Sequence, residues 1–168
     1  GWNGFNVLHT AAARVAYTFM PSDALHWEVG ASALYGGLDD ATSRIGHYKA
    51  YALHTNVNWN RWNFQAQASH YDYDTDSGAT RLAVGAYAFY DTIAAKADSY
   101  TLNARYHLPV SWGPIGGLDF YNDYSLITHK SGWLPSTFMN VLGIGVSAGD
   151  LYTYVDFVTA RNQPIIGG

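Results

Sequence analysis

The segment from Trp62 to Ser69 constrains the fold of this chain more than any other. Apolar side chains stand at every second position, Trp62, Phe64, Ala66 and Ala68, and only amides and a hydroxyl stand between them. A period of two is that of a β-strand, because successive side chains point to opposite faces of the sheet. A polar face without Lys or Glu indicates an enclosed surface, so the apolar face is expected outside. This inverted pattern is typical of a transmembrane β-barrel.

The composition excludes several other classes of protein. Charged residues make up 13% of the chain and aromatic residues 16%, whereas charged residues usually account for about a quarter of a soluble domain. The formal net charge of −4 and the lack of a basic run argue against nucleic-acid binding. The chain has no Cys, which excludes disulfide and thiolate chemistry. No apolar run approaches the roughly 18 residues of a transmembrane helix.

Alternating segments recur along the whole chain and are joined by turns and loops that alternate in length. The predicted strands cover residues 7–19, 25–35, 47–58, 62–73, 99–108, 115–126, 137–148 and 151–159. Short turns are expected at 20–24, 58–61, 109–114 and 149–150, and long loops at 36–46, 74–98 and 128–136. Tight turns on one side and long loops on the other are typical of outer-membrane barrels. We therefore predict one domain over 1–168, an all-β, transmembrane, antiparallel up-and-down β-barrel of about eight strands.

The segment 82–90 also has the residue types of a strand, but we do not count it as a spanning strand. Adding it would move the later tight turns to the side of the long loops and break the alternation. We expect 74–98 to be one long outer excursion, with local strand structure or folded into the barrel mouth.

The predicted inner face carries charged groups and imidazoles. The expected pore-lining residues are Arg14, His26, Glu28, Lys49, His54, His70, Arg105, His107, Asp119, Asp123 and Asp156. In a wide barrel such groups would line a water-filled path and bias which ions pass. In a narrow barrel they would pair across the interior, because an unpaired buried charge is costly. The sequence leaves both interpretations open. Because these residues carry charges of both signs, they do not indicate whether anions or cations would be preferred.

Aromatic residues near the strand ends are expected to lie at the membrane interfaces, where amphipathic rings gather. The predicted interface residues are Trp27, Tyr35, Trp59, Trp62, Tyr100, Tyr106 and Trp112. The rival interpretation, a soluble aromatic core, would require more Lys and Glu on the polar faces.

No catalytic, metal or cofactor site is predicted. His26 and Glu28 share a strand face, but no third ligand stands at a recognised zinc spacing. Asp72, Asp74 and Asp76 alternate as in some calcium loops but lack the later Gly and Glu of an EF-hand. Adjacent strand residues point to opposite faces, so Ser69 and His70 cannot act together. The glycines at 143–149 precede no helix, and we expect them to accommodate either strand curvature or large inward side chains such as Tyr152.

The C-terminal half of the chain resembles a known group of proteins. The segments 109–115, 120–125, 140–143, 148–156 and 162–164 carry the likeness. Over residues 81–168 the chain resembles the C-terminal part of Gram-negative outer-membrane porins, within which the phosphate-selective class is the nearest group. The resemblance implies a barrel of about 16 strands, wide enough for an aqueous channel. It therefore implies that this chain is a segment of a longer porin or lacks a final strand.

These observations lead to three functional expectations. The first is a porin-like channel in the bacterial outer membrane for passive diffusion of small polar solutes or ions. The second is a small closed outer-membrane barrel with a structural or adhesive role and no open pore. The third is a soluble ligand-binding barrel of the lipocalin type. For the first two, the expected partners are outer-membrane lipid and further copies of the chain, not nucleic acid.

Overall fold

The structure, a computed structural model, describes residues 6–40, 42–86 and 89–163. Nearly all of this part is β-structure. The strands are β1 (Asn6–Ser22), β2 (Leu25–Asp39), β3 (Arg44–Trp59), β4 (Trp62–Thr75), β5 (Arg81–Ala86), β6 (Phe89–Ala94), β7 (Lys96–Trp112), β8 (Ile115–Thr128), β9 (Thr137–Ala148) and β10 (Leu151–Arg161). One 3-10 turn, η1 (Ser131–Trp133), interrupts the connection between β8 and β9.

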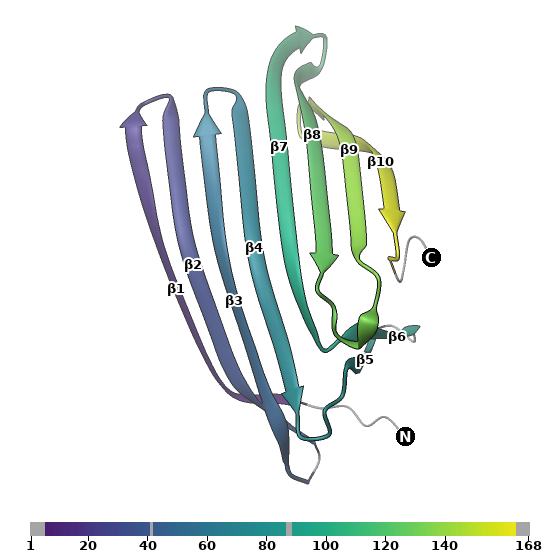
Figure 1. The fold of residues 1–168 in the computed structure, drawn as a ribbon. Helices are drawn as coiled ribbons and strands as arrows, with labels where there is room; N and C mark the ends of the chain where they lie inside the picture. Colours follow the sequence, from purple (N-terminus) through teal and green to yellow (C-terminus); the bar gives the residue numbers. More distant parts are fainter. Residues whose placement is uncertain (1–5, 41, 87–88, 164–168) are drawn as a thin grey trace.

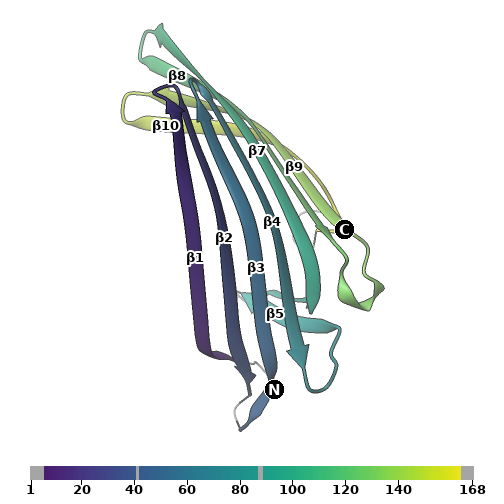
Figure 2. The ribbon, with the colours of Figure 1, turned by 60° about the vertical axis from the view of Figure 1, so that its left-hand side comes forward.

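Eight of these strands form one curved antiparallel sheet, in which each strand pairs with the next along the chain (Figures 1 and 2). The order is β1-β2-β3-β4-β7-β8-β9-β10. The predicted all-β, antiparallel, up-and-down arrangement is confirmed. Within the described residues the sheet is open, because no pairing joins β1 to β10. The tight turns lie at the upper end in Figure 1, and the longer connections lie at the lower end.

The excursion between β4 and β7 contains a separate two-stranded hairpin, β5–β6, which is no part of the large sheet. The hairpin runs crosswise to the long strands in both ribbon views (Figures 1 and 2). Its base is held by backbone hydrogen bonds: the N–H of Ala95 donates to the Thr80 carbonyl at 3.0 Å, and the N–H of Tyr73 donates to the Ala95 carbonyl at 2.8 Å. The prediction that 82–90 adds no strand to the large sheet, and that local strand structure forms here, is confirmed for the described residues of this segment, outside which 87–88 lie.

The strands extend further than the sequence predicted, so the predicted connections 20–24, 36–46 and 109–114 are wrong in extent, and only residues 23–24 connect β1 to β2. The predicted loop 36–46 is mostly strand, because Gly36 pairs with Tyr48 and Leu38 with Gly46, which leaves residues 40–43 as the connection. The predicted turn 109–114 shrinks to Gly113 and Pro114, because β7 continues to Trp112. Pairing with a neighbouring strand satisfies backbone groups at these ends that a loop would leave to water.

A β-bulge near the start of β1 changes which face its first residues occupy. His9 has a positive φ of 50°, and the register shifts between Leu8 and Ala11. One extra residue in a strand reverses the alternation beyond it. Leu8 consequently pairs with Gly37 and shares a face with Ala11, although an uninterrupted alternation would place these two residues on opposite faces.

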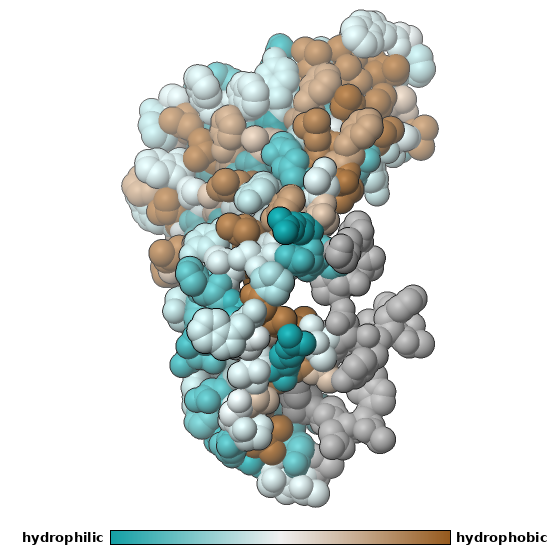
Figure 3. All heavy atoms as spheres, turned by 45° about the vertical axis from the view of Figure 1, so that its right-hand side comes forward, coloured by the Kyte–Doolittle hydropathy of each residue, from teal (hydrophilic) through white to brown (hydrophobic). Residues whose placement is uncertain are grey.

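Large apolar side chains of the sheet are exposed, and the buried apolar residues are few. Among the described residues the buried hydrophobic side chains are Leu38, Leu82, Ala94, Ala95 and Ala97, at the loop end where the hairpin meets the sheet. In the view of Figure 3, hydrophobic residues gather in the upper half, toward the tight turns, and hydrophilic ones predominate below. Among the described residues no helix is long and apolar enough to span a bilayer.

Candidate functional site on the polar face of the sheet

The register separates the sheet into two faces. The face that carries Trp27, Leu53, Phe64 and Leu102 is here called the apolar face, and the opposite one the polar face. Nine of the eleven predicted pore-lining residues share the polar face: Arg14, His26, Glu28, His54, Arg105, His107, Asp119, Asp123 and Asp156. The sheet therefore gathers most of the predicted charged groups on one surface.

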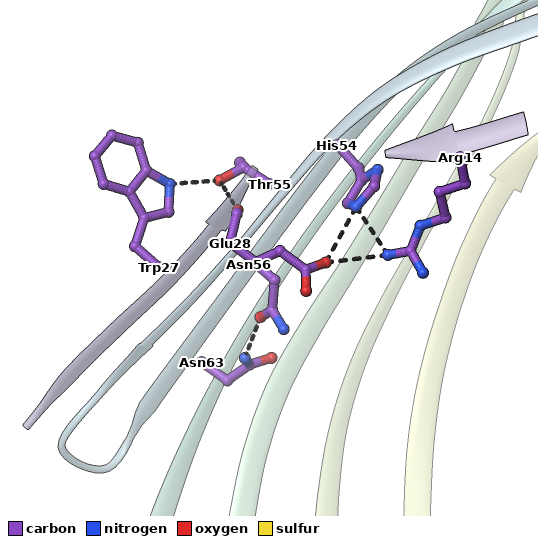
Figure 4. A network of polar contacts seen from close by, with 7 residues as sticks. All are labelled: Arg14, Trp27, Glu28, His54, Thr55, Asn56 and Asn63. Carbon is purple, nitrogen blue, oxygen red and sulfur yellow. Dashed lines mark hydrogen bonds and ion pairs between the residues drawn. The ribbon is translucent and has the colours of Figure 1, made fainter. Parts of the chain in front are cut away.

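Three of these residues, Arg14, Glu28 and His54 of β1, β2 and β3, form what we call the N-terminal triad (Figure 4). Arg14 Nη2 lies 3.1 Å from Glu28 Oε1 and 3.1 Å from His54 Nε2, and His54 Nε2 lies 3.2 Å from Glu28 Oε1. His54 Nε2 accepts from Arg14 when it lacks a proton and donates to Glu28 when it carries one. The triad can thus rearrange its hydrogen bonds around a single proton.

A glycine makes the close packing of the triad feasible. A Cβ atom on Gly30, which pairs with His54, would stand 2.6 Å from His54 Nε2. Since no real Cβ comes that close, the imidazole occupies space that only glycine leaves open. The triad borders a polar hollow of about 360 Å³ that also reaches Ser32 and Gln67.

Amide side chains continue the polar face between the triad and the tight turns. Asn63 Nδ2 donates to Asn56 Oδ1 at 2.7 Å and to Asn58 Oδ1 at 2.8 Å. Gln65 Nε2 donates to Asn63 Oδ1 at 2.9 Å. Linked amides offer both donors and acceptors without net charge, so this surface suits water and small polar molecules of either sign.

On the other half of the sheet, Asp119 of β8 is the centre of a second group, the C-terminal cluster. Asp119 is 2% exposed. Its Oδ2 lies 2.9 Å from Arg105 Nη2, and its Oδ1 accepts from Arg105 Nε at 3.1 Å and lies 2.8 Å from His107 Nδ1. The Tyr152 hydroxyl donates to Asp119 Oδ2 at 3.5 Å. The charge of a buried carboxylate is thereby compensated by a two-point contact with a guanidinium.

Tyr152 fits beside Asp119 because its neighbour on β9 is a glycine. A Cβ on Gly145 would collide with the Tyr152 hydroxyl and stand 2.6 Å from its Cζ. The prediction that a glycine of the 143–149 stretch makes room for Tyr152 is confirmed. Further along β10, Asp156 Oδ1 accepts a hydrogen bond from the Tyr121 hydroxyl at 2.5 Å. Asp123 Oδ1 accepts one from Asn103.

Contrary to the prediction that the eleven residues share one face, Lys49 and His70 lie on the opposite face from the other nine. Lys49 pairs with Asp72 and His70 pairs with Tyr51, so all four lie on the apolar face. Lys49 stands two positions from Tyr51 on β3, and His70 stands two positions from Ala68 on β4, so each belongs to the apolar face of its strand. The prediction followed the polarity of the two side chains instead of their positions. Lys49 Nζ lies 3.3 Å from Asp72 Oδ2, and His70 Nδ1 lies 2.6 Å from Asp98 Oδ1.

The predicted interface aromatics divide between the ends of the sheet. Trp27, Trp59, Trp62, Tyr106 and Trp112 lie toward the tight-turn end. Their rings contact one another and their neighbours: Trp62 is centred 4.7 Å from Tyr106, and Trp27 is centred 5.3 Å from Phe19. Toward the loop end, Tyr35 pairs with Lys49. Tyr100 pairs with Ala68 within the apolar face rather than at its end.

Two ionisable residues in the connections are perturbed by local contacts. The backbone N–H groups of Thr42 and Ser43 donate to Asp40, which lowers the pKa of this carboxyl. Burial lowers the pKa of Lys130, which hydrogen-bonds Thr137. Neither residue contacts the polar-face groups described above. In residues 6–40, 42–86 and 89–163, no group of three or more His, Asp or Glu could hold a metal ion.

The fold and the two faces define the chain as an all-β protein built on an antiparallel up-and-down sheet. Searches against protein-family models, curated proteins and solved structures found no match for this chain.

Proposed function

We propose that this chain forms part of the wall of an outer-membrane β-barrel and that its polar face lines a water-filled path for small polar solutes or ions. The supporting observation is the exposure of large apolar side chains on the apolar face: Leu53 is 65% exposed, Leu102 56% and Phe157 67%. A soluble protein rarely leaves a continuous apolar surface of this size uncovered. Hydrocarbon would cover it in a bilayer.

Residues of the apolar face that pair across β3, β4, β7 and β8 form successive rows perpendicular to the strands. The composition of these rows supports a bilayer-spanning position for the apolar face. The first row, near the tight turns, is Trp59, Trp62, Tyr106 and Phe120. The fifth row contains Tyr51, eight positions before Trp59 on β3, which corresponds to about 27 Å along the strand and about 21 Å along the normal of a bilayer for a strand tilted near 40°. Between the first row and the fifth, the register places mainly Val, Ala, Leu, Phe and Thr. An apolar band about 25 Å tall between aromatic girdles is the outer surface of a membrane barrel.

An enclosed path requires the edges β1 and β10 to be paired, because the described strands leave them free. The even number of strands gives β1 and β10 opposite directions, so either another segment of the same protein or a second copy could continue the antiparallel order. A barrel of about 16 strands encloses an aqueous channel, whereas about eight strands closed on themselves leave an interior filled by side chains.

The pairing of the polar-face charges favours the second candidate, a closed barrel without an open pore. Arg14 is paired with Glu28, and Arg105 with Asp119, so these charges already have partners. In a narrow barrel such pairs would stabilise a filled interior. Conductance distinguishes the two candidates.

We expect the protein, once folded in lipid, to produce stepwise ion conductance in planar bilayers, because water and ions would then reach the polar face from both sides of the membrane. Folding is checked first by resistance to proteolysis in vesicles and by altered gel mobility without heating. Lipid-folded protein that yields no conductance steps would exclude the channel and leave the closed barrel.

We further expect Glu28→Gln to shift the ion selectivity of that conductance toward anions. The change removes one negative charge from the hollow beside Arg14 and leaves the guanidinium uncompensated. Reversal potentials measured under a KCl gradient report the shift. The matched control is Asp23→Asn, which removes the same charge in the exposed turn between β1 and β2. Equal reversal potentials for the two variants would show that Glu28 does not face the ion path.

A further inference from the structure

The apolar face ends, toward the long connections, in a group of charged residues. Lys49 of β3, Asp72 of β4 and Lys96 of β7 stand side by side in one register row, here called the charged row. Both lysine Nζ atoms lie 3.3 Å from the same carboxylate atom, Asp72 Oδ2. Two ammonium groups therefore share one carboxylate, and one positive charge is left without an anion in this row.

The two ammonium groups of the charged row are exposed and its carboxylate is covered. The side chains of Lys49 and Lys96 are each 52% exposed, whereas that of Asp72 is 13% exposed. In the adjacent row, Asp98, whose side chain is 26% exposed, contacts His70 of β4, 16% exposed, and His129 of the connection after β8, 75% exposed. An anion that approaches the charged row would therefore first meet the ammonium groups of Lys49 and Lys96.

The height of the charged row above the tight turns matches a lipid headgroup. Lys49 lies ten positions before Trp59 on β3, about 34 Å along the strand and about 26 Å along the normal of a bilayer for a strand tilted near 40°. The charged row would then stand at the boundary of the hydrocarbon on the side of the long connections. On the tight-turn side of the charged row, Tyr51, Leu53 and Tyr100 present apolar surface to an acyl chain.

We propose that Lys49 and Lys96 bind the phosphate of a membrane lipid whose acyl chains lie along Tyr51 and Leu53; this inference rests on the membrane position proposed above. A phosphate oxygen would take the uncompensated positive charge of the row, and the lysine stems would lie on the apolar surface with their ammonium groups at the headgroup. One row further toward the loops, His47 pairs with Asp74. That carboxylate confines the anion to the level of the lysines.

The test compares spin-labelled phosphatidic acid with spin-labelled phosphatidylcholine at the surface of the protein inserted in phosphatidylcholine vesicles. The one excess positive charge of the charged row predicts about fivefold preference for phosphatidic acid. K49Q/K96Q, which leaves only the Asp72 carboxylate in the row, is expected to reduce this ratio to one or below. K49R/K96R, which keeps both charges, retains the preference, as does Arg61→Gln, which removes a positive charge at the opposite, tight-turn end.

The outcomes separate this inference from the proposal on which it rests. Protein that does not enter vesicles contradicts the membrane position and this inference together. Protein that inserts but shows the same lipid preference with and without Lys49 and Lys96 contradicts only the lipid site. Release of phosphatidic acid by millimolar inorganic phosphate would assign the row to free phosphate and overturn the lipid assignment.

Discussion

Replacing Leu102 by Arg is expected to prevent or strongly weaken insertion into lipid. Leu102 is 56% exposed and lies on the apolar face in the third row from the tight-turn aromatics. In the proposed orientation this row is close to the middle of the hydrocarbon, where an Arg costs about 2–4 kcal/mol. The measurement is the urea dependence of folding into phosphatidylcholine vesicles.

The adjacent residue of β7 provides the control for Leu102→Arg. Thr101 is also exposed but faces the opposite side, where it pairs with Gln67. Thr101→Arg introduces the same side chain one position away and is expected to fold into vesicles nearly as the parent does. In a soluble protein both positions would be exposed surface, and each change would alter stability by less than about 0.5 kcal/mol. Equal behaviour of the two variants would therefore contradict the membrane position.

The alternation of residues was sufficient to predict the large sheet. Segments such as 62–69 repeat apolar residues at a period of two, and the alternation of short and long connections excluded 82–90 from the spanning strands. Neither signal contains information on which residues of neighbouring strands pair. For the same reason the strand ends were predicted poorly: residues 36–39 become strand only because Tyr48 and His47 of β3 pair with them.

Lys49 and His70 show that the position of a residue in the strand alternation predicts its face better than its polarity does. His70 follows Phe64, Ala66 and Ala68 at intervals of two, so its position alone assigns it to the apolar face. Residue type suggested the opposite, and position prevailed, because a strand without a bulge keeps its alternation whatever its side chains. The bulge at His9 is the converse case, since no residue type in β1 marks where the alternation reverses.

The partners within each cluster could not be predicted from the sequence. Arg14 and His54 are forty positions apart, and they meet because β1 and β3 both pair with β2. A register shift of one residue in either pairing would separate them by turning one side chain to the other face. The sequence thus predicts which residues share a face, and the register of the strands decides which of them touch.

Asp119→Asn is expected to lower the free energy of unfolding by about 2 kcal/mol. The carboxylate is buried, and breaking a buried ion pair costs about 3–5 kcal/mol, reduced here because Arg105 is about half exposed. Urea-induced unfolding in detergent micelles measures the change, and Asp150→Asn in the exposed turn between β9 and β10 is the control. The double variant R105Q/D119N should be less destabilised than the sum of the single changes by about 1 kcal/mol, because it leaves no unpaired guanidinium. Strict additivity, or a D119N midpoint equal to that of D150N, would show that the contact between Arg105 and Asp119 contributes nothing to the stability of the sheet.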